Sequence, residues 1–185
     1  SADWRFVDGI PTVKQRLRLC DDDPSAVLFA GQPSAADCTG VAVGENLVLT
    51  AAHCVLANAN ASPNVPGGYV IRSDLTSILH VFDYQIDPKT NAIPPTLPST
   101  SIFKTTEVVD YRYVGGVSDW ALVRVENVGD PSFKIPARRI TDYVRDGSHF
   151  NFPRFNGTQN VVTIGTPSGA PLKITDQAQV ISPVV

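Results

Sequence analysis

The sequence predicts an all-β protein. Fifteen prolines and thirteen glycines divide the 185 residues into short segments, which favours many brief strands over long helices. Several of these segments are rich in Val, Ile, Tyr or Thr, whose stiff or flat side chains suit a pleated sheet. A hydrophobic content of 43% and a charged content of 18% are typical of a folded chain rather than a disordered one.

Turn residues and apolar runs place the expected elements along the chain. Gly44-Glu45-Asn46 separates two apolar runs and is typical of a hairpin turn. Helix is expected only as one turn within Ala51–Ala59 and a short piece at Arg138–Val144, and the four prolines within Asp87–Ser101 predict a surface loop. The predicted strands are Ala26–Phe29, Gly40–Val43, Leu47–Thr50, Gly68–Arg72, Ile78–Tyr84, Ile102–Asp110, Ala121–Val125, Val161–Ile164 and Ala178–Ile181.

Charge and hydropathy exclude two classes of partner. The net charge is -3 and no basic run is present, so we expect no nucleic-acid partner. No apolar stretch approaches the roughly 18 residues of a membrane span, so we expect no membrane partner either. The chain opens on Ser1-Ala2-Asp3-Trp4 with neither a charged leader nor an apolar core, and we expect any signal peptide to have been removed.

The stretch from Cys38 to Cys54 carries the strongest chemical signal. Two apolar runs form a predicted hairpin, and a tight turn then presents His53 beside Cys54. The two cysteines are 16 residues apart at neighbouring ends of this hairpin. A disulfide between them would clamp the turn that carries His53, contributing about 3 kcal/mol by the loop-entropy model. A general base benefits from such rigidity, because small displacements of a catalytic group are costly to rate.

Two motifs, one in this region and one further along the chain, resemble those of the trypsin/chymotrypsin-like serine proteases. Thr50-Ala51-Ala52-His53-Cys54 resembles the histidine motif of that family, including the C-x-G strand before it. Asp119-Trp120-Ala121-Leu122 resembles its D-x-A-L motif. The resemblance implies that His53 is the general base and that Asp119 is a buried carboxylate that accepts the second ring N–H of the histidine.

A third stretch extends the resemblance toward the carboxy-terminal end. Ile164-Gly165-Thr166-Pro167-Ser168-Gly169-Ala170-Pro171-Leu172-Lys173 is similar to the I-G-x-P-S-G-x-P-L-K segment of bacterial trypsin-like peptidases, where it begins the second barrel. The resemblance spans roughly residues 19 to 181. It implies a trypsin-like double β-barrel, with an amino-terminal arm at 1–14, a complete first barrel at 15–127 that carries both motif residues, and a linker at 128–140. Residues 141–185 are then opening strands of a truncated second barrel, because about 45 residues cannot supply six strands and their turns.

The sequence departs from the family at the nucleophile. The G-[DN]-S-G motif of the family is absent from these 185 residues. The nearest match is Ser168, but Thr166 stands where the oxyanion hole of the family uses a glycine, and only 17 residues follow Ser168. We therefore expect the nucleophilic serine to lie beyond residue 185 of the intact protein. Two smaller departures are the 66-residue gap from His53 to Asp119 and an amino-terminal serine in place of Ile or Val.

The predicted function is that of a secreted serine endopeptidase that hydrolyses peptide bonds by acyl transfer and needs no cofactor or metal. Its partners are expected to be a protein or peptide substrate and, after processing, a carboxy-terminal fragment of the same protein. The alternatives are a non-catalytic secreted binding module that has lost the serine, and a two-chain enzyme cleaved after Val185.

Other candidate residues have less specific surroundings. Asp110 in Val108-Val109-Asp110 is the rival to Asp119. His80 and His149 lack metal-ligand spacing and are expected to be surface or packed residues. Asp21-Asp22-Asp23 is interpreted as a solvated acidic turn before Pro24, with calcium binding as the alternative.

Cys20 remains after the expected pairing of the other two cysteines. It is expected to be free or to pair with a cysteine outside these 185 residues.

Overall fold

The computed structural model describes residues 3–20, 29–59, 68–87, 89–90, 92–114, 117–135, 144–146, 149–151 and 160–179. Within these ranges the chain is nearly all β, and its one α-helix is α1 (Val13–Leu17). No helix in the described ranges is long and apolar enough to span a membrane. The prediction of an all-β protein is confirmed. The short 3-10 turns are η2 (Ala52–Cys54), η3 (Leu75–Ser77), η4 (Ser99–Ser101) and η5 (Pro167–Gly169).

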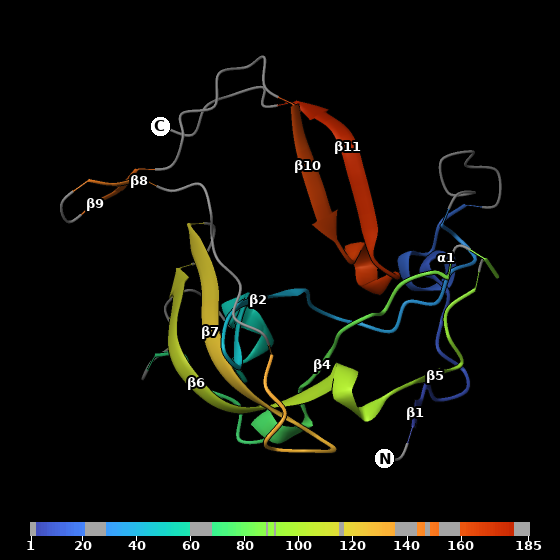
Figure 1. Ribbon diagram of the computed structural model, residues 1–185. Coiled ribbons are helices and arrows are strands. Elements are labelled where there is room, and N and C mark those ends of the chain that lie inside the picture. Colours follow the sequence, from blue (N-terminus) through green and yellow to red (C-terminus); the bar gives the residue numbers. More distant parts are fainter. Residues whose placement is uncertain are drawn as a thin grey trace.

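A five-stranded antiparallel sheet forms the centre of the structure (Figure 1). Its first two strands are joined by the predicted hairpin, and its two longest strands, β6 and β7, are neighbours. Strands were expected at all five places, although β6 and β7 run further than predicted. In spatial order the strands are β2 (Gly40–Gly44), β3 (Leu47–Thr50), β7 (Ser118–Asn127), β6 (Ile102–Val114) and β4 (Leu79–Val81).

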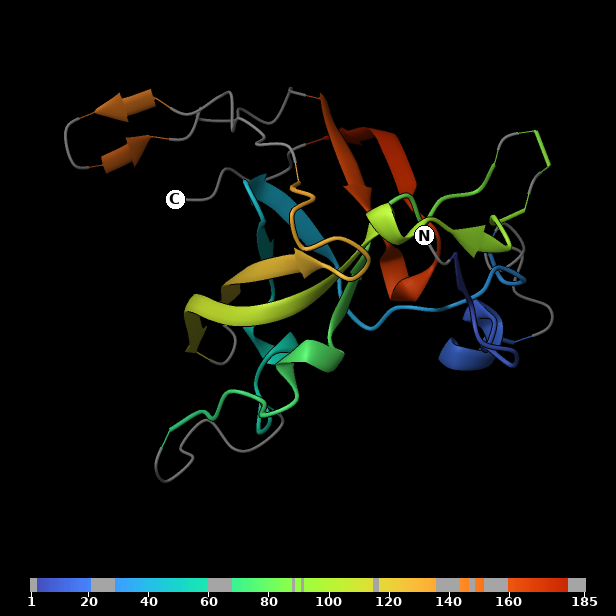
Figure 2. The ribbon, with the colours of Figure 1, turned by 60° about the horizontal axis from the view of Figure 1, so that its bottom comes forward.

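The sheet curls into a half-barrel, which Figure 2 shows from a second side. The pairing of β6 with β7 shifts register twice, between Thr105 and Glu107 and between Val108 and Asp110. Such bulges bend a strand and increase its twist. The curl brings the outer strands β2 and β4 close together. A Cβ atom added at Gly40 of β2 would lie only 3.6 Å from Nδ1 of His80 in β4. A glycine is needed there, since the same added atom would also lie 2.7 Å from Val48.

The hydrophobic core fills the inside of this curl. Every second residue of β7 from Ala121 to Val125 is buried, as a strand with one covered face requires. Ala52, the first residue of η2, and Val55, the residue that follows η2, are fully buried against them. The turn that carries His53 is therefore anchored from both ends. The cluster consists of Val48, Ala52, Val55, Leu56, Phe103, Ala121, Val123, Val125 and Ile135.

Some elements differ from the sequence prediction. Gly68–Arg72 is not a strand. A single bridge joins its Ile71 to Leu56 in the short segment after η2, and the hydroxyl of Tyr111 in β6 donates to the carbonyl of Tyr69. The strand expected at Ala178–Ile181 begins earlier, as β11 (Lys173–Gln179). The predictions at Ala26–Phe29 and Arg138–Val144 lie outside the described residues except for Phe29, which is in a turn, and Val144, which begins a short strand.

The proline-rich segment Asp87–Ser101 is only partly a surface loop. Its last residues form β5 (Thr96–Leu97), which pairs with β1 (Trp4–Arg5), and then η4. Leu97, Ser99 and Ser101 are buried. The buried amide of Asn127 donates to the carbonyls of Ser99 (2.8 Å) and Ile102 (3.1 Å) and so ties the end of the loop to β7.

Helix α1 was not predicted, although its amino-terminal signal is present in the sequence. Thr12 and Gln15 form a capping box, in which the hydroxyl of Thr12 accepts from the backbone N–H of Gln15 and the amide of Gln15 accepts from the backbone N–H of Thr12. The spacing T-x-x-Q predicts a helix start. The helix has only five residues, so its hydrophobic periodicity is too short to see.

The remaining strands form two hairpins, β8 (Val144–Asp146) with β9 (His149–Asn151) and β10 (Asn160–Gly165) with β11. Figure 1 shows the second hairpin extending away from the half-barrel, with its base beside α1. The η5 turn forms that base and is fixed to residues 34–36. Ser34 Oγ donates to the carbonyl of Ser168 (2.6 Å), and the backbone N–H of Ala35 donates to the carbonyl of Gly169 (2.9 Å).

A Gly169→Ala substitution should loosen this contact. Gly169 has a φ of +71°, and an added Cβ would lie 2.1 Å from the carbonyl oxygen of Ala36. We expect the backbone N–H of Ala35, which donates to Gly169, to exchange with solvent at least about tenfold faster in the variant, since a loss of about 1.4 kcal/mol gives that factor. Hydrogen exchange read by NMR measures this, with a Gly9→Ala variant as control because Gly9 has a similar φ and open space around it. Unchanged protection at Ala35 would contradict the prediction.

His80 should make the stability of the fold fall in acid. Its Nε2 lies 2.8 Å from the hydroxyl of Thr105, which is fully buried, and desolvation by burial lowers the pKa of His80 from 6.5 to about 4. The unfolded chain therefore binds a proton at higher pH than the folded chain does. The free energy of unfolding should decline as pH falls from about 6.5 to about 4, by roughly 1 kcal/mol per pH unit.

The test is urea unfolding of the parent chain and of a His80→Gln variant across this pH range. Gln keeps a hydrogen-bonding group but does not titrate, so the difference between the two curves isolates the histidine. Parallel curves would show that the proton on His80 does not affect folding.

Candidate active site

The pairing of β3 with β7 brings the two motif residues together. Thr50, the last residue of β3, lies opposite Ala121, and the strands are antiparallel. The chain leaving β3 therefore runs beside the first residues of β7, where Asp119 is the second residue. The η2 turn then directs His53 back over this strand end. Residues 66 positions apart in sequence meet here because of one strand register.

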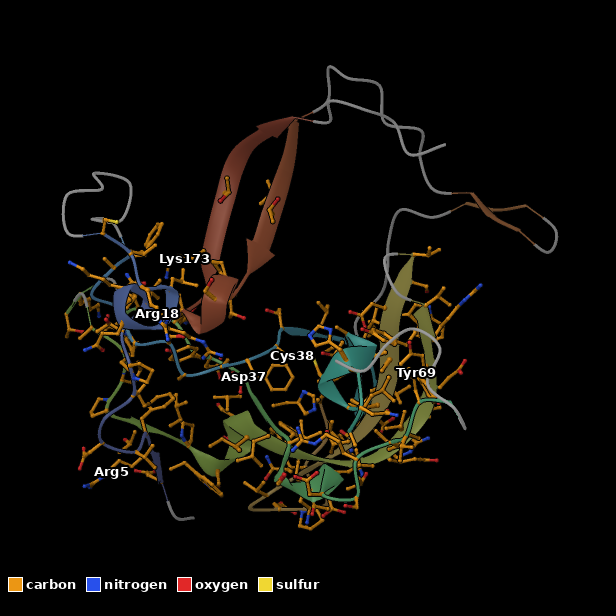
Figure 3. The ribbon with its side chains drawn as sticks, turned by 180° about the vertical axis from the view of Figure 1, so that it is seen from behind. Arg5, Arg18, Asp37, Cys38, Tyr69 and Lys173 are labelled. Atoms are coloured by element: carbon orange, nitrogen blue, oxygen red, sulfur yellow. A yellow bond between two sulfur atoms is a disulfide. The ribbon has the colours of Figure 1, made fainter. Side chains whose placement is uncertain are left out.

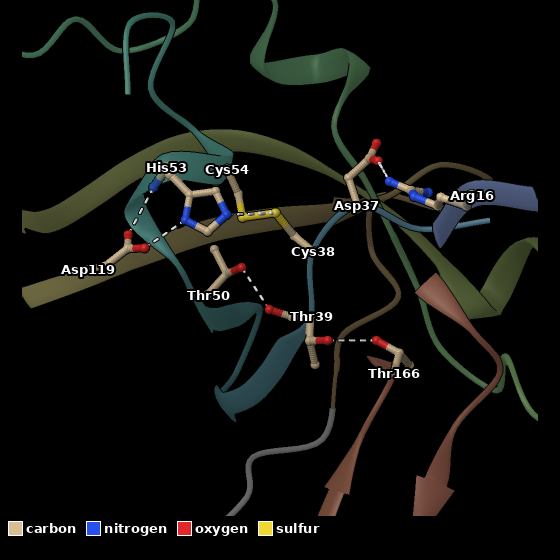
Figure 4. Close-up of a disulfide and its surroundings, with 9 residues drawn as sticks. All are labelled: Arg16, Asp37, Cys38, Thr39, Thr50, His53, Cys54, Asp119 and Thr166. Atoms are coloured by element: carbon tan, nitrogen blue, oxygen red, sulfur yellow. Dashed lines mark hydrogen bonds and ion pairs between the residues drawn. A yellow bond between two sulfur atoms is a disulfide. The ribbon is translucent and has the colours of Figure 1, made fainter. Parts of the chain in front are cut away.

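The carboxylate of Asp119 accepts two hydrogen bonds from His53 (Figure 4). Oδ2 of Asp119 lies 2.6 Å from Nδ1 of the imidazole, and Oδ1 lies 3.0 Å from the backbone nitrogen of His53. An ionised carboxylate can only accept, so Nδ1 carries the hydrogen, and in the neutral imidazole Nε2 is then the nitrogen with the free electron pair. The two bonds fix both the tautomer and the orientation of the ring.

The rival carboxylate does not occupy this place. Asp110 lies opposite Leu122 in the β6–β7 pairing, and its side chain accepts from the backbone N–H of the next residue, Tyr111. The structure thus places Asp119, and not Asp110, against the imidazole of His53.

Two opposing effects act on the pKa of Asp119. The side chain is 39% exposed and is not the buried carboxylate that the resemblance implies. The burial it has raises the pKa of its carboxyl, and the hydrogen bonds from the ring and backbone of His53 lower it. The hydrogen bonds outweigh the burial, and the pKa lies below its ordinary value. Asp119 is therefore an anion at neutral pH and can stabilise a positive charge on the imidazole.

The expected disulfide between Cys38 and Cys54 is present, with 6.4 Å between the Cα atoms. It links Cys38, two residues before β2, to the last residue of η2, and it lies beside the imidazole on the Nε2 side, with Sγ of Cys38 3.8 Å from Nε2 of His53. Figure 3 shows Asp37 and Cys38 on the segment that passes between α1 and the half-barrel. Cys20 is exposed and unpaired.

A second tie crosses the site from the carboxy-terminal hairpin. The hydroxyls of Thr39 and Thr166 lie 2.6 Å apart, and the hydroxyl of Thr50 donates to the carbonyl of Thr39 (2.8 Å). Arg16 of α1 pairs with Asp37 and also donates to the carbonyl of Ala36. Sequence reasoning missed these contacts, because no motif joins residues so distant along the chain.

Ser168 lies elsewhere. It lines a cavity of about 210 Å³ between α1 and η5, together with apolar side chains that include Val13, Leu17 and Phe29. No hydrogen bond connects Ser168 to His53 in the described part of the chain. His80 is partly buried on the edge strand β4, with its Nε2 against the hydroxyl of Thr105. The side chain of His149 and all of Asp21-Asp22-Asp23 lie outside the described residues.

Comparison with known protein families identifies this arrangement. The trypsin family matches residues 24–181, which is most of the chain. The chain belongs to the trypsin family. Searches of curated proteins and of solved structures returned no match.

Removing the disulfide should destabilise the chain. A Cys38→Ala/Cys54→Ala double variant releases a 16-residue loop and should lose about 3 kcal/mol of unfolding free energy by the loop-entropy model. Urea unfolding of the variant and of the oxidised parent measures the difference. Cys20→Ser is the matched control and should leave stability unchanged, because Cys20 is exposed and unpaired. Equal urea midpoints for the double variant and the parent would contradict the prediction that the disulfide stabilises the fold.

Proposed function

We propose that this chain is the amino-terminal part of a secreted serine endopeptidase whose nucleophilic serine follows residue 185. The observation that supports this most strongly is the two-point hydrogen bond from His53 to Asp119, which leaves Nε2 with its electron pair on a half-exposed ring (48% exposed). The pattern is the one a general base needs when a second side chain must orient it. The disulfide supports secretion, because such bonds persist in oxidising compartments.

In the proposed mechanism, Nε2 of His53 takes the proton from the serine hydroxyl as its oxygen attacks the peptide carbonyl. The resulting imidazolium is stabilised by the carboxylate of Asp119 and then returns the proton to the leaving amine. The acyl-enzyme is hydrolysed by a water molecule that His53 deprotonates in the same way. Asp119 stays ionised throughout, in keeping with its lowered pKa.

The alternative is a secreted binding module of the same fold, in which this pair persists without a nucleophile. No tetrapeptide of the G-[DN]-S-G type occurs in residues 1–185. The coding sequence past Val185 separates the two functions. A G-x-S-G motif within a few tens of residues supports the peptidase, whereas a replaced serine supports the module.

The longer protein should lose its peptidase activity when the pair is broken. His53→Ala should lower kcat/KM by at least about 10³-fold, and Asp119→Asn by about 10⁴-fold, because the amide favours the wrong tautomer. Asp110→Asn is the matched control and should retain full activity. Hydrolysis of a denatured protein substrate reports activity, and unfolding midpoints show that the variants fold. Full turnover by His53→Ala would exclude a catalytic role for His53.

Residues 1–185 alone should not react with a serine-directed fluorophosphonate. Imidazole and carboxylate only activate a nucleophile, and the expected serine is outside this range. The longer protein should be labelled at a serine after residue 185, as located by peptide mass spectrometry. Labelling at Ser168 would show instead that the nucleophile is in this chain.

A further inference from the structure

We propose that reduction of the Cys38–Cys54 disulfide converts this corner of the half-barrel into a binding site for a thiophilic divalent metal ion of the Zn²⁺ class. Ligand atoms of Cys38, His53 and Cys54 all lie within 4.8 Å of one another. No other such group of three or more His, Cys, Asp or Glu residues occurs in the described part of the chain. While the S–S bond is intact, the two sulfurs cannot bind a metal ion as thiolates, and reduction makes them available.

The chemistry of opening is a two-electron reduction. A dithiol supplies two electrons and two protons and becomes a disulfide, or a phosphine supplies the electron pair while water supplies the two protons and the oxygen of the phosphine oxide. The S–S bond breaks, and two protein thiols form. The two protein thiols then each release a proton to solvent when the metal binds, because the thiolate is the ligand. His53 contributes the electron pair of Nε2, so the complex has two negative sulfur ligands and one neutral nitrogen ligand.

The geometry needs little rearrangement. In a tetrahedral zinc site with Zn–S of about 2.3 Å and Zn–N of about 2.0–2.1 Å, ligand atoms lie about 3.5–3.8 Å apart. Sγ of Cys38 and Nε2 of His53 are already 3.8 Å apart. The two sulfurs must separate from bonding distance to that spacing, and the 6.4 Å between their Cα atoms leaves side-chain rotation able to provide it.

The surroundings of His53 also suit a metal ligand. Metal-bound histidines almost always donate their second ring N–H to a carboxylate, a carbonyl or water, which fixes the tautomer and strengthens the bond to the ion. Asp119 already holds Nδ1 at 2.6 Å, and its second oxygen is fixed by the backbone N–H of His53. The half-exposed ring gives an ion a path from solvent and leaves the fourth coordination position for water.

Metal in this site would oppose the proposed function. The ion uses the same Nε2 electron pair that a general base uses to take a proton. The reduced, metal-bound state would therefore be inactive as a peptidase. This consequence rests on the proposed function, whereas metal binding itself does not.

Cobalt binding to residues 1–185 tests the site without any peptidase assay. A Cys20→Ser chain is reduced with a phosphine under nitrogen and titrated with Co²⁺. We expect one equivalent to bind, with thiolate-to-cobalt charge-transfer absorption and the d–d bands of a tetrahedral ion, and Zn²⁺ should displace it. The oxidised chain and a reduced Cys38→Ser/Cys54→Ser chain should give neither signal.

Two variants distinguish a built site from simple chelation by two thiols. His53→Ala should weaken Co²⁺ binding by at least about tenfold, and Asp119→Asn by about 10–100-fold. Asp110→Asn should bind like the parent. Equal affinity in all of these variants, as for an unfolded dithiol, would overturn the proposal, and so would the absence of thiolate bands in the reduced parent. Failure of the peptidase assays would leave these outcomes unaffected, so the two proposals fail separately.

Discussion

The register between β3 and β7 is the constraint on which the rest of the site depends. Because Thr50 pairs with Ala121 in an antiparallel ladder, the residues that follow β3 must lie over the residues that begin β7. A slip of one residue would turn every side chain of β3 to the opposite face of the sheet. It would expose Val48, which is now fully buried, and move the η2 turn away from Asp119. Burial of the core thus fixes the distance between His53 and Asp119.

Three further contacts prevent the imidazole from moving once that register is set. Ala52 and Val55 anchor the turn in the core, and the disulfide ties the turn to Cys38 in the segment before β2. Asp119 holds the ring by two hydrogen bonds. An exposed imidazole on a turn that is anchored in the core is the arrangement expected where a functional group must be both accessible and rigid. The same preorganisation makes His53 a suitable metal ligand when the neighbouring sulfurs are released.

Much of this could be predicted from the sequence, for identifiable reasons. The hairpin before His53 shows two apolar runs around Gly44-Glu45-Asn46, and the partner of His53 precedes an apolar strand. Both are local signals that tertiary contacts reinforce.

The elements and contacts that the sequence did not predict correctly have a common physical cause. Gly68–Arg72 has strand-like composition, but its backbone lies beside a segment too short for a ladder and forms one bridge, between Ile71 and Leu56. The end of Asp87–Ser101 has the proline-rich composition of a loop, yet the amide of Asn127 and a pairing with β1 hold it in place. The contacts of Arg16 and Thr166 with the site join residues more than twenty and more than one hundred positions from their partners. Partners at such separations leave no local pattern in a single sequence.

The most direct test of the account is a crystal structure of the protein extended past residue 185, after reaction with a fluorophosphonate. We predict a phosphonylated serine among the added residues, with Nε2 of His53 about 2.6–3.2 Å from an oxygen of the adduct and Asp119 still hydrogen-bonded to Nδ1. A modified serine remote from His53, or an extended chain that carries no reactive serine, would contradict it.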